Sequence, residues 1–160
     1  MEVLKFPHPS LFSVTTPVTV FGEELKVLLD SMYETMKTNR GLGLAANQVG
    51  LTFRMFVMDG PLGRINVVNP TIVKKSLLTV RIKEGCLSSP GDFIIVPSRV
   101  DWVQVQYQDE TGETKLVTLK GIHAICAQHE MEHLSGESFM EHKSIAKPVR
   151  RKLAKKWGLK

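Results

Sequence analysis

The chain has 160 residues, which is enough for one domain with a hydrophobic core and too few for two. Its formal net charge at pH 7 is +5, and 42 % of its residues are hydrophobic, which is ordinary for a soluble globular protein. The sequence contains no run of eighteen apolar residues, which is about the length needed to span a membrane. Its N-terminus lacks the pattern of a signal peptide. Two cysteines form no disulfide framework, which favours a reducing compartment. We therefore predict a single cytoplasmic domain, residues 1–160.

Residues 1–21 are predicted to be irregular, because three prolines interrupt any regular element there. A helix is predicted from Gly22 to the region just before Gly41. Apolar residues recur at helical spacing within it, which is typical of a face that packs against a core. These residues are Leu25, Leu28, Leu29, Met32 and Met36.

Residues 41–50 are glycine-rich and almost uncharged. A phosphate-binding loop is one interpretation, but no Lys-Ser/Thr pair follows and the strand-then-helix context is absent, so we reject it. Gly41 and Gly43 instead predict a tight backbone that approaches a ligand closely. Gln48 carries an amide group that can donate a hydrogen bond to a developing oxyanion.

Six segments in the middle of the chain predict β-strands, because they are rich in Val, Ile, Phe and Tyr and are separated by turn signals such as Pro90-Gly91-Asp92. Consecutive strands without intervening helices favour an α+β fold over an α/β fold. We predict small antiparallel sheets packed around a buried central helix, with an N-terminal helix and a short basic C-terminal helix. The predicted strands are 53–58, 65–73, 77–82, 93–97, 102–107 and 115–119.

Residues 128–133, Gln-His-Glu-Met-Glu-His, predict a metal-binding helix. Histidines four residues apart lie on one helix face, so His129 and His133 can bind one metal ion at about 2 Å. Glu130 lies just off that face, where it can act on a water molecule as the general base of a His-Glu-x-x-His hydrolase. The flanking residues, from Ile122 to Leu134, are largely apolar and predict a buried helix, in which imidazole nitrogens need partners.

A hydrolytic site with two histidines needs a third protein ligand and an open coordination position. The spacings of the common His-Glu-x-x-His proteases do not fit, because Phe139 replaces one class's third histidine and no acidic residue follows Glu141. His142 is a further candidate, but it fits neither spacing. Cys126 shares the helix face, but these positions span about 10 Å along the axis, too far to converge on one ion. Cys86 is left as the predicted third ligand.

Three segments occur in a fixed order: 41–48, Glu-Gly-Cys-Leu-Ser at 84–88, and 128–133. They resemble the three signature motifs of the peptide deformylases, and the resemblance runs from Phe6 to the basic C-terminus. It implies a metal-dependent hydrolase that removes the N-terminal formyl group from formyl-methionyl nascent polypeptides and releases formate. The alternatives are another metal amidase or deacylase on the same scaffold, or a non-catalytic, metal-stabilised protein that binds ribosomes.

The resemblance also implies roles for particular residues. Cys86, His129 and His133 would hold one divalent metal ion; Fe(II) is typical of the family, and zinc, nickel or cobalt can occupy such a site. Glu130 would be the general base, while the Gln48 amide and the Leu87 backbone N–H would stabilise the oxyanion. The methionine side chain of the substrate would contact Leu42, Gly43, Ile82, Ile122, Ile125 and Cys126.

Residues 143–160 contain eight basic residues and no acidic residue, so the rest of the chain is net acidic. A helix is predicted there, with a narrow apolar stripe and Gly158 as its stop. A solvated helix face and a surface for polyanionic RNA both fit this pattern. The resemblance implies contact with the ribosome, and we predict that the protein is a monomer.

Glu132 stands where the family usually has aspartate. We predict that it turns away from the metal-binding face and pairs with Arg99. Glu84 is predicted to support the site by pairing with the same arginine, with an ordinary surface ion pair as the alternative.

Overall fold

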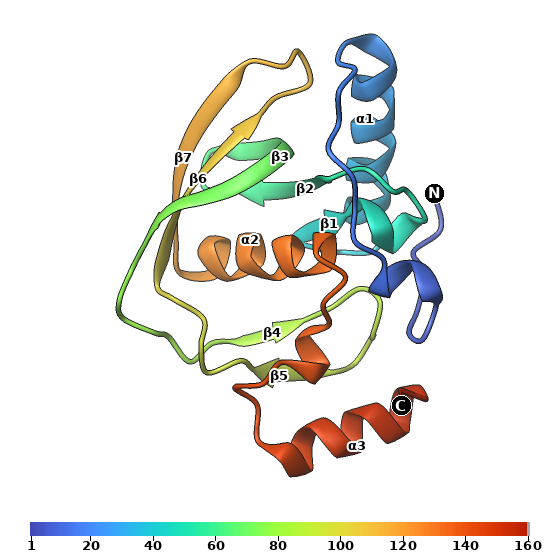
Figure 1. Ribbon diagram of the computed structural model, residues 1–160, viewed down its shortest axis with the longest axis vertical. Coiled ribbons are helices and arrows are strands. Elements are labelled where there is room, and N and C mark those ends of the chain that lie inside the picture. Colours follow the sequence, from blue (N-terminus) through green and yellow to red (C-terminus); the bar gives the residue numbers. More distant parts are fainter. Residues whose placement is uncertain (160) are drawn as a thin grey trace.

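The computed structural model describes residues 1–159 as three α-helices, seven β-strands and three short 3₁₀ turns (Figure 1). The helices are α1 Glu23–Thr38, α2 Gly121–Leu134 and α3 Lys147–Trp157. An antiparallel sheet has the order β1-β2-β3-β6-β7, with bounds Gly43–Ala45, Met55–Gly60, Gly63–Lys75, Trp102–Gln108 and Thr114–Lys120. A separate hairpin pairs β4 Lys83–Gly85 with β5 Phe93–Ile95. The predicted α+β class is confirmed.

Helix α2 lies between the five-stranded sheet and the β4–β5 hairpin (Figure 1). Its Ala124 and Ala127 share an apolar cluster with Val103, Val105 and Leu119 of the sheet. The two valines of β6 are buried and the glutamines that alternate with them, Gln104 and Gln106, are more exposed, which is the period of two expected of a strand with one buried face. The small alanine side chains let the helix pack closely on this sheet. The opposite side of α2 faces the β4–β5 hairpin (Figure 1).

Helix α1 packs on the part of the sheet formed by β1 and β2, as its apolar spacing predicts. Its inward face shares an apolar cluster with Val57 and Val68 of the sheet. The buried apolar residues of this face are Leu25, Leu29, Met32 and Met36, whereas Leu28 is partly buried.

Segment 77–82 is not a strand, contrary to the prediction. Leu77 and Leu78 project into solvent, with exposed fractions of 98 % and 73 %, and Thr79 forms an isolated bridge to Val100. Two consecutive apolar residues point to opposite sides of a strand, and no sheet covers either side here, so burial does not stabilise further pairing. Beyond this segment, regular strand pairing resumes at β4.

Residues 41–50 form two regular elements, which the glycine-rich pattern did not predict. They contain β1, which pairs with β2, and a 3₁₀ turn, Ala46–Val49, that carries Gln48. The predicted close approach is found at Gly43, where a Cβ would lie 2.6 Å from the Glu130 Oε1 atom of α2. The first strand of the sheet and α2 are therefore in direct contact at this glycine.

Helix α3 ends at Gly158, whose φ of 65° lies in the left-handed region that glycine favours at helix ends. Leu153 is buried and belongs to an apolar cluster that also contains Phe139 and Cys86. Helix α3 thus packs on the same side of the molecule as the β4–β5 hairpin (Figure 1). Within residues 1–159, no helix combines the length and apolar composition needed to cross a membrane.

Candidate metal and catalytic site

The structure brings Cys86, His129 and His133 together, with one ligand atom of each lying within 4.8 Å of the others. The helical spacing places the two imidazole rings 4.8 Å apart, and Cys86 reaches them from the position just after β4. The Cys86 Sγ atom is 3.2 Å from His133 Nε2. One thiolate and two imidazoles suit Fe(II), zinc, nickel or cobalt better than magnesium or calcium. The donor set therefore fits the predicted divalent ion.

Cys126 is outside this group, as its position along the helix axis predicts. Its sulfur instead packs against β1, because a Cβ at Gly43 would lie 2.6 Å from Cys126 Sγ. Burial raises the pKa of the Cys126 thiol well above its ordinary value, which keeps the group neutral. Cys126 is thus an apolar wall residue in this structure.

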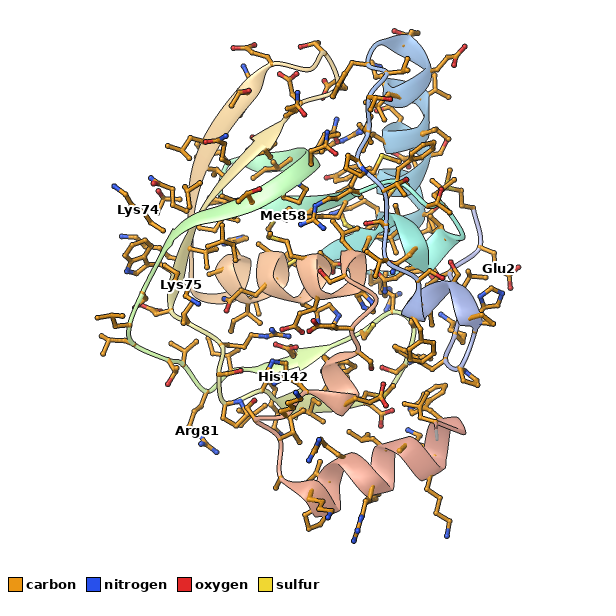
Figure 2. The ribbon with its side chains drawn as sticks, in the orientation of Figure 1. Glu2, Met58, Lys74, Lys75, Arg81 and His142 are labelled. Atoms are coloured by element: carbon orange, nitrogen blue, oxygen red, sulfur yellow. The ribbon has the colours of Figure 1, made fainter. Side chains whose placement is uncertain are left out.

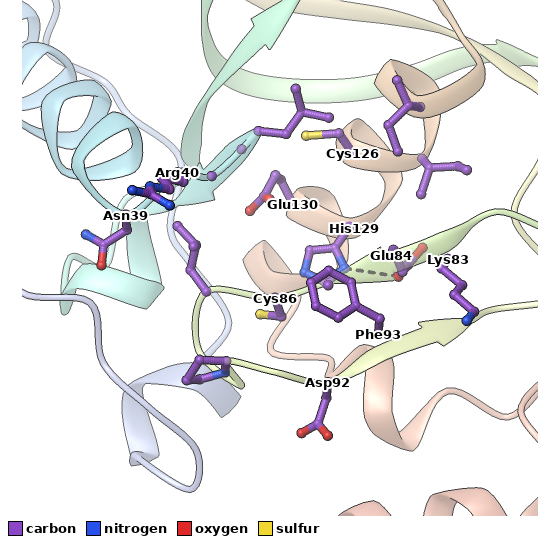
Figure 3. A pocket seen from close by; sticks show the side chains of 18 of the residues that line it. Asn39, Arg40, Lys83, Glu84, Cys86, Asp92, Phe93, Cys126, His129 and Glu130 are labelled. Carbon is purple, nitrogen blue, oxygen red and sulfur yellow. Dashed lines mark hydrogen bonds and ion pairs between the residues drawn. The ribbon is translucent and has the colours of Figure 1, made fainter.

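His129 is oriented by Glu84, whose Oε1 atom lies 3.0 Å from His129 Nδ1 (Figure 3). An imidazole that donates Nδ1–H to a carboxylate presents its Nε2 atom to a metal. Burial alone would raise the pKa of Glu84, but hydrogen bonds from Arg99 and His129 outweigh it and lower that pKa to about 2. Glu84 is therefore an anion that keeps the imidazole in one orientation.

Arg99 holds Glu84 from behind and is only 2 % exposed. Its Nε and Nη2 atoms donate to the two Glu84 oxygens at 2.7 and 2.6 Å. The same guanidinium donates to both oxygens of Glu132, from Nη2 at 2.9 Å and from Nη1. The predicted pairing of Arg99 with both glutamates is confirmed, and it is a buried network rather than a surface pair.

His142 extends this network, because its Nε2 atom lies 3.5 Å from Glu132 Oε1. The residue follows the 3₁₀ turn Phe139–Glu141 and lies beneath α2 (Figure 2). The sequence contained no local signal for this contact, because His142 and Glu132 come from separate elements. Among the described residues, His142 does not belong to the group of metal donors that Cys86, His129 and His133 form.

Glu130 is buried beside the histidines, and within the described residues its Oε2 atom has no hydrogen-bond partner. Burial raises the pKa of this carboxyl group to about 7, although His129 and a backbone contact to Ala45 act in the opposite direction. A carboxyl group with a pKa near neutrality can both accept and return a proton. The missing side chain of Gly43 provides the space that this carboxylate occupies.

Gln48 is held so that its amide nitrogen faces the cluster. Its Oε1 atom accepts the Ala45 backbone N–H at 2.9 Å, so Nε2 is the end that reaches Ser88 Oγ at 3.1 Å and Cys86 Sγ at 3.4 Å. The neighbouring Leu87 carbonyl accepts from Lys5 Nζ at 2.6 Å. The backbone after Cys86 is therefore fixed by contacts from two other segments.

A cavity of about 480 Å³ opens beside Cys86, His129 and Glu130 (Figure 3). Five of the six predicted substrate-contact residues line it, but Ile82 does not. Ile122 is 42 % exposed, which differs from the burial predicted for the surroundings of the motif.

Residues to which the sequence assigns no role also line the cavity: Asn39, Arg40, Pro90, Gly91, Asp92 and Phe93. Pro90-Gly91-Asp92 was recognised only as a turn signal.

The family model described as Polypeptide deformylase matches residues 1–150 of this chain. A relative from Tolumonas auensis, named Peptide deformylase, is 38 % identical over 160 residues, covering 97 % of this chain and 95 % of the relative. A relative from Agrobacterium fabrum, named Peptide deformylase-like, is 38 % identical over 156 residues, with coverage of 97 % and 93 %.

Solved structures give a similar result. The chain is similar to peptide deformylase 1B of Arabidopsis thaliana in complex with an inhibitor, with a TM-score of 0.90 and 34 % identity over 99 % of this chain and 88 % of that chain. It is also similar to a peptide deformylase from Legionella pneumophila, with a TM-score of 0.88 and 34 % identity over 98 % of this chain and 91 % of that chain.

Proposed function

The chain belongs to the polypeptide deformylase family, and we propose that Cys86, His129 and His133 hold the divalent ion with which it works. The family consists of metal-dependent hydrolases that remove the N-terminal formyl group from formyl-methionyl nascent peptides. One observation carries the assignment of roles: three metal-donor side chains and the Glu130 carboxylate meet in one buried cluster beside an apolar cavity.

A divalent ion held by Cys86, His129 and His133, which we propose is Fe(II), would supply Lewis-acid chemistry to water and to the formyl carbonyl. Glu130 accepts a proton from the attacking water and later delivers it to the leaving amine. Burial supports this role, because it raises the pKa of Glu130 to about 7 and so allows proton transfer in both directions. Glu84 and Arg99 keep the His129 ring in place throughout.

The oxyanion that forms at the formyl carbon would accept hydrogen bonds from Gln48 Nε2 and from the Leu87 backbone N–H. The Gln48 amide is already oriented toward the cluster by its bond from Ala45. A preoriented donor needs little reorganisation when charge develops, which is why such donors lower the barrier.

The substrate methionine would occupy the cavity beside the cluster. Leu42, Ile125 and Cys126 provide apolar walls there, which match a flexible thioether side chain. The crowding around Gly43 leaves little space beside the Glu130 carboxylate. A formyl group, with only hydrogen on its carbonyl carbon, fits such a space better than an acetyl group.

The test is formate release from formyl-Met-Ala-Ser by the Fe(II)-loaded enzyme under anaerobic conditions, with acetyl-Met-Ala-Ser as the matched substrate. We expect rapid release of formate and little release of acetate. Preferred hydrolysis of the acetyl peptide would favour another amidase on this scaffold. Full metal content without any turnover would instead favour a non-catalytic binding protein.

We further propose that residues 1–160 act as one catalytic domain, although residue 160 lies outside the described residues. The support is that Leu153 of α3 and Cys86 belong to the same apolar cluster. A helix that contributes to this cluster is part of the domain rather than an independent appendage.

Helix α3 is also our proposed contact for ribosomal RNA. Arg151, Lys152 and Lys155 are exposed, and no acidic residue follows Glu141 in the sequence. A cationic surface of this kind binds a polyanion in a salt-dependent manner. Deleting the helix would be an unclear test, because Leu153 supports the core.

Replacing Arg151, Lys152 and Lys155 by glutamine removes charge without removing this packing. We expect weaker co-sedimentation with ribosomes at low salt and a shallower dependence of binding on salt concentration. The matched control replaces the exposed Lys74, Lys75 and Lys120 by glutamine. Lys74 and Lys75 lie on the sheet, away from α3 (Figure 2). Equal loss of binding in both triple variants would contradict a specific role of α3.

A further inference from the structure

Asp92 links the wall of the substrate cavity to α3. Its backbone lies at the end of the loop that follows Cys86, and its side chain points away from the cavity (Figure 3). Asp92 Oδ1 accepts from Lys156 Nζ at 2.7 Å, and Oδ2 accepts from Trp157 Nε1 at 2.5 Å. Both donors come from the last turn of α3. We call these three residues the clasp.

The clasp differs from an ordinary surface ion pair. The Asp92 side chain is only 13 % exposed, and each of its oxygens has a donor. Burial alone would raise the pKa of Asp92, but the hydrogen bonds from Lys156 and Trp157 hold it below its ordinary value. Trp157 also packs against the apolar cluster that contains Leu153, so its N–H is presented from a supported ring.

The other side of this loop forms the cavity. Residues 90–93 all line it, and Phe93 is 67 % exposed at its rim. The Phe93 ring lies over Gly85, where a Cβ would come within 2.8 Å of Phe93 Cε1. Gly91 has a φ of 86°, which permits the turn that brings Asp92 toward α3.

The two ends of the loop are held by different parts of the molecule. At its start, Lys5 binds the Leu87 carbonyl, and the Phe6 N–H donates to the Ser88 carbonyl at 3.1 Å. Near its end, Asp92 is bound by α3. Cys86 and Leu87, the proposed metal donor and oxyanion donor, are thus next to supports that do not involve α3. A loosened clasp would therefore move residues 90–93 without displacing Cys86 or Leu87.

We propose that the clasp positions the 90–93 wall, so that α3 determines how tightly the enzyme binds the peptide that follows the formyl-methionine. This inference rests on the proposed function, since it takes a formyl peptide as the substrate. Lys156 and Trp157 are positioning residues that act through Asp92. Loss of the clasp raises KM for peptide substrates and leaves kcat nearly unchanged, because the catalytic groups are held elsewhere.

The experiment measures kcat and KM for formate release by the metal-loaded variants Asp92→Ala and Trp157→Phe. For formyl-Met-Ala-Ser we expect KM to rise about tenfold in Asp92→Ala, the effect of losing charge-assisted hydrogen bonds. Trp157→Phe keeps the ring and loses the donor, so its KM should rise about threefold. In both variants kcat should stay within about twofold of wild type. For formyl-methionine amide, which has no following residues, KM should change less.

Two further variants separate positioning from general destabilisation. Asp92→Asn keeps an oxygen that can accept the Trp157 N–H, and it should restore much of the lost affinity. The double variant Asp92→Ala/Trp157→Phe should resemble Asp92→Ala alone, because both changes act on one contact. The matched control is Asp30→Ala on α1, where another carboxylate receives two cations, Lys26 and Arg64, away from the cavity. It should leave KM unchanged.

An unchanged KM in Asp92→Ala, or a fall in kcat alone, would overturn the inference even if the variant melts at a lower temperature. An equal rise of KM for the peptide and for formyl-methionine amide would also overturn it, because the whole site would then be disturbed. The proposed function has a separate readout, which is the release of formate rather than acetate by the wild-type enzyme, so its failure is distinguishable from failure of this inference.

Discussion

Helices α2 and α3 are both short, but they relate to their surroundings in opposite ways. Helix α2 is enclosed by the sheet and the β4–β5 hairpin, and eight of its fourteen residues are buried. Helix α3 lies at the surface and buries only Leu153 among its eleven residues. The polar groups of α2 therefore need protein partners, whereas Arg151, Lys152 and Lys155 of α3 are exposed to water.

The difference determines what a substitution can do. An isolated buried charge costs about 3–5 kcal/mol, whereas an exposed ion pair contributes about 0–1 kcal/mol. Changes in α2 should therefore alter chemistry or folding, and changes in α3 should alter affinities. The clasp is the place where α3 reaches the cavity, through its contacts with Asp92.

The largest expected effect comes from the metal-donor cluster. Each of Cys86→Ala, His129→Ala and His133→Ala should lose the bound ion, about one per chain in the wild-type enzyme, together with turnover, because two ligands hold such an ion poorly. Elemental analysis of the purified variants measures this. Cys126→Ala is the matched cysteine control and should keep its metal. Normal metal content in Cys86→Ala would show that the ligand set is wrong.

Glu130→Gln should have the next largest effect on activity. The amide cannot accept a proton from water, and loss of a general base commonly costs about 10²–10⁴-fold in rate. Metal content and the thermal unfolding midpoint should remain near those of the wild type, because the amide has nearly the same shape. Formate release close to the wild-type rate would assign the base to another residue.

Glu132 tests the buried network behind α2. Glu132→Ala leaves part of the Arg99 guanidinium without its acceptor and should destabilise the fold by about 2 kcal/mol in urea unfolding. Glu132→Asp keeps the charge and should retain metal and at least about a tenth of the activity, a loss within about 1.4 kcal/mol. If Glu132→Asp instead lost its metal, the carboxylate would have to act on the metal rather than on Arg99.

The smallest expected effect is the pH dependence of the clasp. The pKa of Asp92 in the folded protein lies below its ordinary value of 3.8, so its stabilising contribution is complete above that value. The contribution is lost as the pH falls through the lower, folded-state pKa. The difference in unfolding free energy between wild type and Asp92→Ala, about 1 kcal/mol at pH 7, should therefore shrink in acid. A difference that grew on acidification would contradict an ionised Asp92 in the folded protein.

Helices and their functional residues were predictable from the sequence because their patterns are local. The spacing of His129 and His133 places them on one helix face wherever that helix packs, and a glycine after a helical stripe ends α3 at Gly158. The pairing of Arg99 with Glu132 was also predicted and is confirmed, although neither its burial nor the contact from His142 was.

Strand pairing and the cavity wall depended on contacts between distant segments. The apolar composition of 77–82 resembles a strand, yet the segment forms only an isolated bridge, from Thr79 to Val100. Residues 43–45 of the glycine-rich segment become a strand because β2 is available to pair with them. Residues 90–93 have the composition of an ordinary turn. They became part of the cavity because tertiary packing places the Cys86 loop between α2 and α3, where Asp92 meets Lys156 and Trp157 across more than sixty residues of chain. The sequence by itself thus predicted the helices and the shared face of His129 and His133, through spacing along the chain, and only the tertiary structure decided which turn faces the cavity.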